Sequence, residues 1–453
     1  MPSSPRSQPS DSTRAGNLST QHARHSENWI RHGVIYEIYT RSFSPAGNFA
    51  GIEQRLPKLK KLGVTILWIM PIHPVGVLHH KGRLGSLYSV RDYYGINPKF
   101  GTIDDFKRLV KMAHKLGFHL IIDLVADHTA WDSKLINEHP DWFTKDSAGN
   151  IVSPNRDWTD VADLNYSKPG LRRYMIAMMK YWVRDIGVDG FRCDVAELVP
   201  IDFWDDARAA LDSIKPVMML AEAAYPPHHL KAFDVSYGWD TYEVLAPIIQ
   251  GKKSVLALDT ILNIERAAYP QGSSIMRFSS NHDENAWDAP DVKKFGITGA
   301  KLAAVVANTL PGIPLLYNGQ EVGNNKKLKL FEKFSIDWKD RTAFRKLYTR
   351  LFDLRKNEPA FSEGEMIRIS SSNPQRVYAF ARVSGTNKFI VALNFGRKVF
   401  DGSLNLSSPD LATENQTTLT DVFTKKTVTA ALPPSKLIPI KIPAMGFRIF
   451  QLK

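Results

Sequence analysis

The chain has 453 residues, a formal net charge of +13, 43% hydrophobic residues and 23% charged residues. This composition is ordinary for a globular protein and excludes a disordered chain, a collagen-like repeat and a coiled coil. No apolar run reaches the length of about 18 residues that a membrane-spanning helix needs, and a single cysteine, Cys193, excludes an internal disulfide.

The first segment, residues 1–28, is rich in Ser with Pro, Gln and Arg, and it contains almost no large apolar side chain. Such a segment cannot bury enough surface to offset the entropy of ordering it, so we predict a disordered tail. It lacks the apolar stretch of a secretory signal, which favours a cytoplasmic protein. A transit peptide is a weaker alternative, suggested by its Arg and Ser content.

Eight short apolar runs then alternate with helical patterns between residues 29 and 359. Several runs are apolar at successive positions, as strands buried on both faces are. Eight strands with intervening helices predict an α/β fold of the (β/α)8 type, a TIM barrel. The runs cover residues 34–39, 64–70, 119–125, 188–192, 217–221, 233–235, 275–278 and 313–317.

Two further segments depart from the barrel pattern. The interval after the third run is the longest, and residues 129–166 carry Trp131, Trp142, Phe143 and Trp158 among Asp, Asn, Pro and Gly. We predict a short insertion there, which divides the barrel into residues 29–128 and 167–359 and lies at the end where barrels hold active sites. From 360 to 453, alternating apolar segments separated by turn residues predict a C-terminal antiparallel β-sandwich.

Polar side chains follow four of the predicted strands. Asp123 and His128 belong to the end of the third strand, and Arg192 and Asp194 end the fourth. Glu222 ends the fifth strand, and residues 281–283 follow the seventh. Because the carboxyl ends of barrel strands meet at one rim, we expect these groups to converge. A structural salt bridge would explain any one of these polar residues, but it does not explain well why all of them lie at the same rim.

This set of residue types suits cleavage of a glycosidic bond through an oxocarbenium-like transition state. One carboxylate must be ionised and directed at the anomeric carbon. A second must stay protonated near neutral pH, which burial or a nearby negative charge favours. An Arg beside the first carboxylate lowers its pKa, and the remaining polar groups can hold sugar hydroxyls.

These segments resemble the conserved regions of the α-amylase family, glycoside hydrolase family 13, over the chain from about residue 29 onward. The resemblance implies that Asp194 is the nucleophile, Glu222 the general acid and base, and Asp283 the transition-state stabiliser. It also implies that the insertion is the family's domain B, because residues 161–165 match the region near the end of that domain.

Four more positions match substrate-binding residues of the family. His128, Arg192 and His282 match its supporting residues, and Tyr88 matches the tyrosine that stacks under the sugar in subsite −1. Residues 312–321 are similar to the family's eighth-strand segment. The partner that the resemblance implies is an α-glucan, and neither a nucleic acid nor a membrane is expected, because the basic residues are scattered and interleaved with apolar ones.

Departures from the family pattern concern calcium and subtype. Asp127 precedes His128 where calcium-dependent α-amylases usually have Asn, and Glu197 and Leu198 stand where these enzymes tend to carry Lys-His. One carboxylate is not a calcium site, so we assign no metal ligand and expect no required cofactor, with bound calcium as a weaker alternative. The nucleophile segment is more similar to neopullulanases and cyclomaltodextrinases, whose N-terminal module we do not recognise here. The oligomeric state therefore stays open.

We expect a retaining α-glucan hydrolase that cleaves α-1,4 bonds in maltooligosaccharides, starch or cyclodextrins through a covalent glycosyl-enzyme. The alternative is an α-glucosidase, or a glucosyltransferase or transglycosylase, of the same family, including trehalose- or sucrose-active types. A non-catalytic binding subunit is disfavoured because all three acids are present. Trp131 and Trp287 are equally consistent with stacking on sugars and with packing loops. Cys193 should point away from Arg192 and Asp194.

Overall fold

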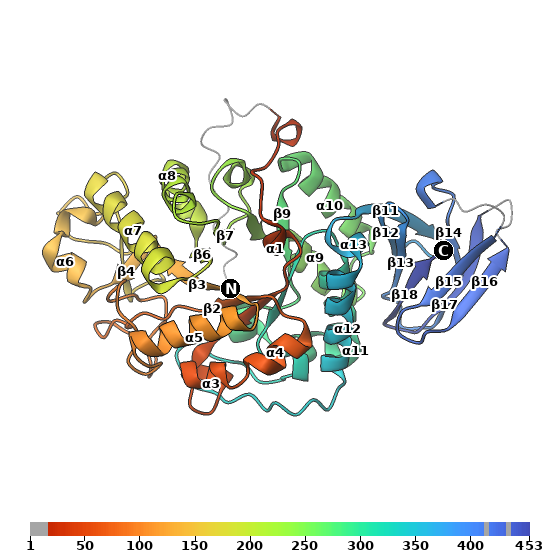
Figure 1. Ribbon diagram of the computed structural model, residues 1–453, viewed down its shortest axis with the longest axis horizontal. Helices are drawn as coiled ribbons and strands as arrows, with labels where there is room; N and C mark the ends of the chain where they lie inside the picture. Colours follow the sequence, from red (N-terminus) through yellow and green to blue (C-terminus); the bar gives the residue numbers. More distant parts are fainter. Residues whose placement is uncertain (1–16, 412–415, 432–435) are drawn as a thin grey trace.

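The computed structural model describes residues 17–411, 416–431 and 436–453. Its larger part is a closed barrel of eight parallel strands inside a layer of helices, and an antiparallel β domain lies beside it (Figure 1). Each barrel strand overlaps one predicted apolar run, so the TIM barrel is confirmed. The strands are β1 (Ile35–Ile38), β2 (Ile66–Ile69), β3 (His119–Val125), β6 (Gly190–Asp194), β7 (Met218–Ala221), β8 (Val235–Tyr237), β9 (Ser274–Arg277) and β10 (Ile313–Tyr317).

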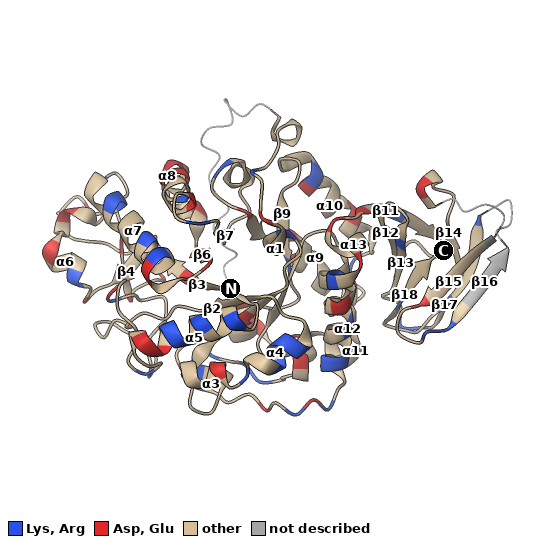
Figure 2. Ribbon diagram, in the orientation of Figure 1, with Lys and Arg blue, Asp and Glu red and all other residues tan. Residues whose placement is uncertain are grey.

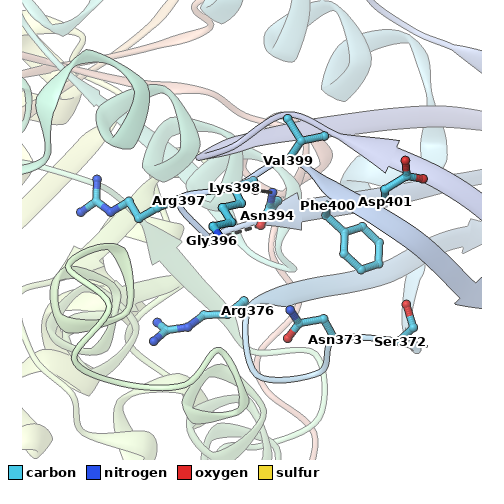
Figure 3. Close-up of a pocket in the computed structure, with 10 residues that line it drawn as sticks. All are labelled: Ser372, Asn373, Arg376, Asn394, Gly396, Arg397, Lys398, Val399, Phe400 and Asp401. Atoms are coloured by element: carbon cyan, nitrogen blue, oxygen red, sulfur yellow. Dashed lines mark hydrogen bonds between the residues drawn. The ribbon is translucent and has the colours of Figure 1, made fainter.

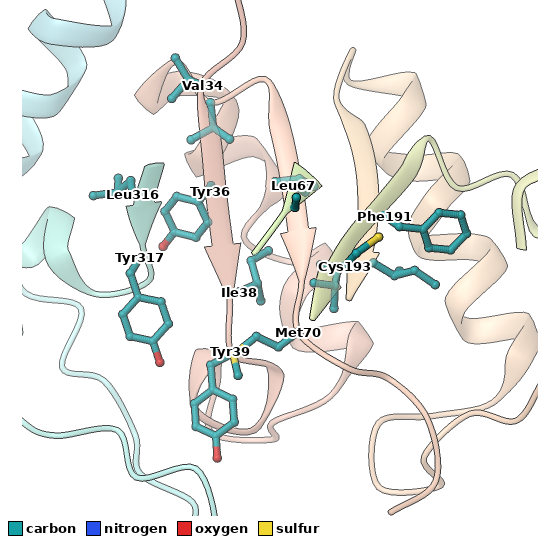
Figure 4. Packing of buried hydrophobic residues seen from close by; sticks show 14 of the residues in the cluster. Val34, Tyr36, Ile38, Tyr39, Leu67, Met70, Phe191, Cys193, Leu316 and Tyr317 are labelled. Carbon is teal, nitrogen blue, oxygen red and sulfur yellow. The ribbon is translucent and has the colours of Figure 1, made fainter. Parts of the chain in front are cut away.

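Successive residues of these strands point alternately into the barrel and toward the helices. Ile35 and Trp68 belong to the cluster inside the barrel. Tyr36, Leu67 and Cys193 belong to the cluster between the strands and the helices (Figure 4). The prediction that Cys193 points away from its two polar neighbours is therefore confirmed. Burial on both faces explains why the strands are almost entirely apolar, and why a charged residue in one of them is informative.

The helices cover the outside of the barrel with one apolar face each. In α5 (Ile103–Lys115), Thr102 and Asp105 cap the first turn reciprocally, and Phe106, Leu109 and Val110 face the core. The other helices are α1 (Asn28–Arg31), α2 (Thr40–Phe43), α3 (Phe49–Glu53), α4 (Leu56–Leu62), α6 (Lys134–Glu138), α7 (Pro169–Tyr181), α8 (Ile201–Asp212), α9 (Trp239–Ile249), α10 (Leu256–Ala268), α11 (Asp291–Thr309), α12 (Phe344–Asn357) and α13 (Pro359–Ser362).

The predicted insertion leaves the barrel at the carboxyl end of β3. It contains α6 and a small antiparallel pair, β4 (His128–Ala130) with β5 (Val161–Asp163), in which His128 lies opposite Asp163. The insertion is therefore tied to the barrel mouth through the strand that carries His128.

The C-terminal domain is an eight-stranded antiparallel sheet in the order β16-β15-β18-β13-β12-β11-β14-β17. Ala379 and Ile390 face a core of this domain alone, whereas Phe380 and Val391 pack into the core cluster that includes the barrel helices. The predicted antiparallel β-sandwich is confirmed. Its strands are β11 (Glu365–Ser371), β12 (Val377–Ser384), β13 (Asn387–Asn394), β14 (Phe400–Asn405), β15 (Gln416–Asp421), β16 (Thr427–Ala431), β17 (Leu437–Ile442) and β18 (Gly446–Leu452).

The N-terminal segment differs in part from the prediction of a disordered tail. Residues 1–16 lie outside the described residues, but residues 17–28 have a defined path on the barrel. Ser26 donates a hydrogen bond to Asp234 (2.7 Å), and the Arg24 guanidinium lies 3.5 Å from the same carboxylate. For residues 17–28 the prediction is wrong because a buried carboxylate holds this polar segment, and composition carries no information on such a partner.

Lys and Arg residues occur on many helices and loops of the barrel and are interspersed with Asp and Glu (Figure 2). Within the described ranges, no helix combines the length and the apolar character needed to cross a bilayer.

Candidate active site

Polar side chains at the barrel mouth gather around Arg192, which is fully buried. Its Nη1 donates to Oδ1 of Asp194 (2.7 Å) and to Oδ1 of Asp123 (2.9 Å). Its Nη2 lies 2.7 Å from Oε2 of Glu222, and its Nε donates to the Tyr237 hydroxyl (3.1 Å). Carboxylates from three strand ends therefore share one guanidinium, which compensates charges that would be costly to bury alone.

The local backbone explains why Arg192 and Glu222 meet. Strand alternation turns Arg192 and Asp194 to the same side. At Gly190 an added Cβ would lie 1.9 Å from the Met218 carbonyl oxygen, so only glycine allows β6 and β7 to approach this closely. The next turn is at Val195, which has φ 37° and whose N–H donates to Oε2 of Glu222 (2.9 Å). Strained backbone of this kind costs on the order of 1 kcal/mol and is common at active sites.

A second group forms around His282, on the segment after β9. Its Nε2 lies 3.3 Å from Oδ2 of Asp283 and 2.8 Å from the Tyr88 hydroxyl, and its ring stacks on that of Tyr88. Its Nδ1 lies 2.5 Å from Oε1 of Glu37. The second oxygen of Asp283, Oδ1, accepts a hydrogen bond from Nε1 of Trp287 (3.2 Å). Asp283 is thus held between an imidazole and an indole.

Tyr88 connects the two groups. Its hydroxyl donates to Oδ2 of Asp123 (3.1 Å), which also belongs to the Arg192 group. The three acids assigned by resemblance keep some access to solvent, since the exposed fraction is 10% for the Asp194 side chain, 14% for Glu222 and 31% for Asp283. Asp123 is 0% exposed, so it serves as an internal support, whereas the three acids can reach a ligand.

His128 lies at the edge of this arrangement, in β4. Its Nδ1 lies 3.3 Å from Oδ2 of Asp127, and its ring contacts Trp158 of domain B. Burial opposes protonation of His128, but the charges of Asp127 and Asp194 raise its pKa above the ordinary value. All seven residues predicted for the site therefore belong to one end of the barrel, with His128 at the start of β4, where the insertion begins.

Burial raises the pKa of both central carboxyls, and the Arg192 charge opposes this in both. Burial raises the pKa of Glu222 to about 7, Arg192 opposes this, and the charges of Asp194 and Asp283 add to it. Arg192 lowers the pKa of Asp194, as expected, but burial has the larger effect, so the net shift of Asp194 is upward. Glu222 can therefore carry a proton near neutral pH, which a general acid requires.

Three supporting residues were not found from the sequence: Glu37, Trp68 and Tyr237. Glu37 is a charged residue in the otherwise apolar strand β1, and this feature of the sequence could have indicated a functional role. Trp68 donates to Oδ2 of Asp123 (3.2 Å), but an aromatic residue in a buried strand gives no sign of such a role.

Trp131 and Asp127, which the sequence also singled out, lie in loops. Trp131 donates its Nε1–H to the Thr159 carbonyl (3.0 Å) and contacts His79 edge-on, so it packs the insertion against the segment that follows β2. In the part of the chain that the structure describes, no three His, Cys, Asp or Glu side chains are placed to hold a metal ion. Asp127 pairs with His128 instead, so the residues that the structure describes here do not fit a calcium site.

A polar hollow of about 510 Å³ lies away from this site, in the C-terminal domain (Figure 3). Arg376, Arg397 and Lys398 line it, but Arg376 donates to the Gly251 carbonyl and Asn394 donates to the Lys398 carbonyl. These polar groups hold loops together, and the hollow contains none of the paired carboxylates found at the barrel mouth.

Comparison with known proteins agrees with this geometry. Residues 11–359 match the family described as alpha amylase, catalytic domain. A solved noncanonic maltogenic alpha-amylase from Thermotoga neapolitana is 34% identical, with a TM-score of 0.86 over 93% of this chain and 99% of that chain. An alpha-amylase from Haloarcula japonica is 29% identical over 81% of this chain and 56% of its own length. An alpha-1,4-glucan:maltose-1-phosphate maltosyltransferase from Streptomyces coelicolor is 26% identical over 84% of this chain and 61% of its own length. The chain thus spans little more than half the length of these two curated relatives.

Proposed function

The chain belongs to the α-amylase family of glycoside hydrolases, and on that premise we propose that it hydrolyses α-1,4 bonds of maltooligosaccharides, starch or cyclodextrins with retention of configuration. The observation that carries this proposal is the shared contact of Asp194 and Glu222 with Arg192, beside Asp283. We also propose the division of the chain into residues 1–28, 29–128, 129–166, 167–359 and 360–453.

In the first step, Glu222 donates its proton to the leaving glycosidic oxygen while Asp194 attacks the anomeric carbon and forms a glycosyl ester. Esterification removes the negative charge of Asp194, which is one of the charges that raise the pKa of Glu222. The pKa of Glu222 then falls, so the same carboxylate becomes able to take a proton from the water that opens the ester. Asp283 and His282 stabilise the distorted sugar, and Tyr88 lies beneath it.

Transfer to a sugar acceptor, instead of water, is the second candidate. It uses the same ester and differs only in the group that opens it, and the similarity to a maltosyltransferase supports it. Exo-action by an α-glucosidase, or action on trehalose or sucrose, is the remaining alternative within the family.

The deciding experiment is product analysis with the full chain. Starch, maltoheptaose, a cyclodextrin, trehalose and sucrose are incubated separately, and the first products are resolved by length and anomeric form. We expect short oligosaccharides in the α form from maltoheptaose. Products longer than the substrate would favour transfer, and glucose alone from the start would favour an α-glucosidase. Products that appear first in the β form would reject the retaining mechanism.

A further inference from the structure

A buried glutamate lies directly behind His282, on the side away from Asp283. Glu37 is 0% exposed and faces the inside of the barrel, as Ile35 does two residues before it. Its Oε1 lies 2.5 Å from Nδ1 of His282, and its Oε2 has no hydrogen-bond partner within the described ranges. A buried carboxylate is costly unless an opposite charge compensates it. The polar contact that compensates Glu37 is therefore the one with His282.

This contact determines what the other ring nitrogen does. Burial raises the pKa of Glu37, and the charges of His282 and Arg192 oppose this. Paired with the imidazolium, the Glu37 carboxylate accepts the hydrogen bond and Nδ1 of His282 donates it. In the doubly protonated ring, Nε2 then donates toward Asp283 (3.3 Å) and toward the Tyr88 hydroxyl (2.8 Å). Without a carboxylate at Nδ1, the ring could be neutral with its proton on either nitrogen.

The groups that face His282 have opposite effects on its pKa. Burial and the Arg192 guanidinium disfavour the imidazolium, whereas the carboxylates of Asp283 and Glu37 favour it. The sum raises the pKa of His282 to about 9. The neutral Trp68 ring also packs against the imidazole, with the two ring planes at 88°. Loss of the Glu37 charge would leave Asp283 as the principal carboxylate in support of the imidazolium.

We propose that Glu37 is a positioning residue of the active site, which fixes the His282 ring through Nδ1 so that the Nε2–H stays directed at Asp283 and the sugar. Glu37 itself does not touch the substrate. The inference rests on the proposed function for its effect on turnover, but the coupling between Glu37 and His282 is a property of the protein without substrate.

A second buried glutamate offers a matched control. Glu321 is 3% exposed and follows β10, the strand that pairs with β1. It accepts hydrogen bonds from the Tyr36 hydroxyl (2.6 Å) and from the Gly319 N–H (2.9 Å), both neutral donors. Glu321→Gln therefore removes a buried carboxylate near the barrel mouth without removing a partner of His282.

The test compares Glu37→Gln with Glu321→Gln in the full chain. With maltoheptaose, we expect Glu37→Gln to lower kcat by roughly 10- to 100-fold, the usual effect of losing a residue that orients an active-site group, with KM changed by less than about threefold. Ring-labelled histidine NMR should show His282 losing its charge at least one pH unit lower than in the parent, with the resonance assigned by its absence in His282→Gln. Glu321→Gln should keep the parent titration of His282 and most of the parent kcat.

An unchanged His282 titration in Glu37→Gln, or an equal loss of kcat in both variants, would overturn the proposal. If Glu37→Gln does not fold, Glu37→Asp keeps the charge on a shorter side chain and should keep His282 charged at pH 8. A neutral His282 at pH 8 in Glu37→Asp would equally reject it. If the parent protein has no activity on α-glucans, the proposed function fails, and the NMR titration still decides the coupling.

Discussion

Two regions of the molecule bury arginine side chains, and they do so in opposite ways. At the barrel mouth, the Arg192 guanidinium is surrounded by carboxylates, which raise its pKa. Where the barrel meets the C-terminal domain, Arg355 and Arg382 are equally buried, but their partners are backbone carbonyl groups. Burial lowers the pKa of Arg355 to about 9 and that of Arg382 to about 10.

The difference in partners implies a difference in role. Carboxylates around Arg192 are themselves titratable, so a change in that guanidinium or in one acid alters the charge of the others. Carbonyl groups cannot titrate. Arg355 donates to the carbonyls of residues 31, 33 and 361, and Arg382 to those of residues 309, 361 and 364, so these two side chains connect segments far apart in the chain. We therefore expect changes at the mouth to affect catalysis and changes at the junction to affect stability.

The largest expected effect is at the mouth. Asp194→Asn should lower kcat for maltoheptaose by roughly 10⁴-fold or more, because the amide cannot form the glycosyl ester. Glu222→Gln should lower it by roughly 10²- to 10⁴-fold, the usual contribution of a general acid. Turnover assays together with circular dichroism check both. Activity near that of the parent in a folded variant would reject the assigned roles.

At the junction, Arg382→Met should leave the kcat of the folded protein unchanged and lower the free energy of unfolding by about 2 kcal/mol or more. The reason is that the carbonyls of Thr309 and Gly364 lose their donor in a buried place, at about 1–3 kcal/mol for each unsatisfied group. Urea unfolding measures the stability, and specific activity in the absence of urea is the control. A loss of kcat without a loss of stability would contradict the division of roles.

The pH dependence should reflect Glu222. Its raised pKa means that the protonated, active form is present below about pH 7 and is lost as the pH rises through that value. The value of kcat/KM for maltoheptaose should therefore fall about tenfold for each pH unit well above 7. A profile between pH 5 and 9 tests this. A constant kcat/KM up to pH 9 would indicate that another group is the acid.

The smallest expected effect is at Trp287, a residue that is 48% exposed and whose Nε1–H donates a hydrogen bond to Asp283. Trp287→Phe keeps an aromatic ring and removes one hydrogen bond to a carboxylate. We expect kcat to fall by roughly threefold to tenfold and the unfolding midpoint in urea to stay the same. Trp131→Phe is the comparison, because that indole donates to a backbone carbonyl in domain B. An equal loss of kcat in the two variants would show that Trp287 has no specific role in the active site.

The sequence predicted the barrel well because burial on both faces leaves a clear apolar pattern at each strand. Arg192 and Asp194 were also predictable, since strand alternation and the position at a strand end place both side chains at the barrel mouth. The contact of Glu37 with His282 could not be predicted, because 245 residues separate the two and a single acid in an apolar strand does not reveal its partner. The path of residues 17–28 depends in the same way on Asp234, a buried carboxylate more than 200 residues away.

The pairing of β1 with β10 has a consequence for how the protein is made. The first barrel strand ends at residue 38, and its neighbour on one side is completed only at residue 317. At translation rates of about 5–20 residues per second, the ribosome needs on the order of tens of seconds between the two. During that interval the nascent chain presents one edge of β1 unpaired, and until residue 282 has been made the Glu37 carboxylate also lacks its imidazole partner. The barrel can therefore close, and the active site can form, only after most of the polypeptide has left the exit tunnel.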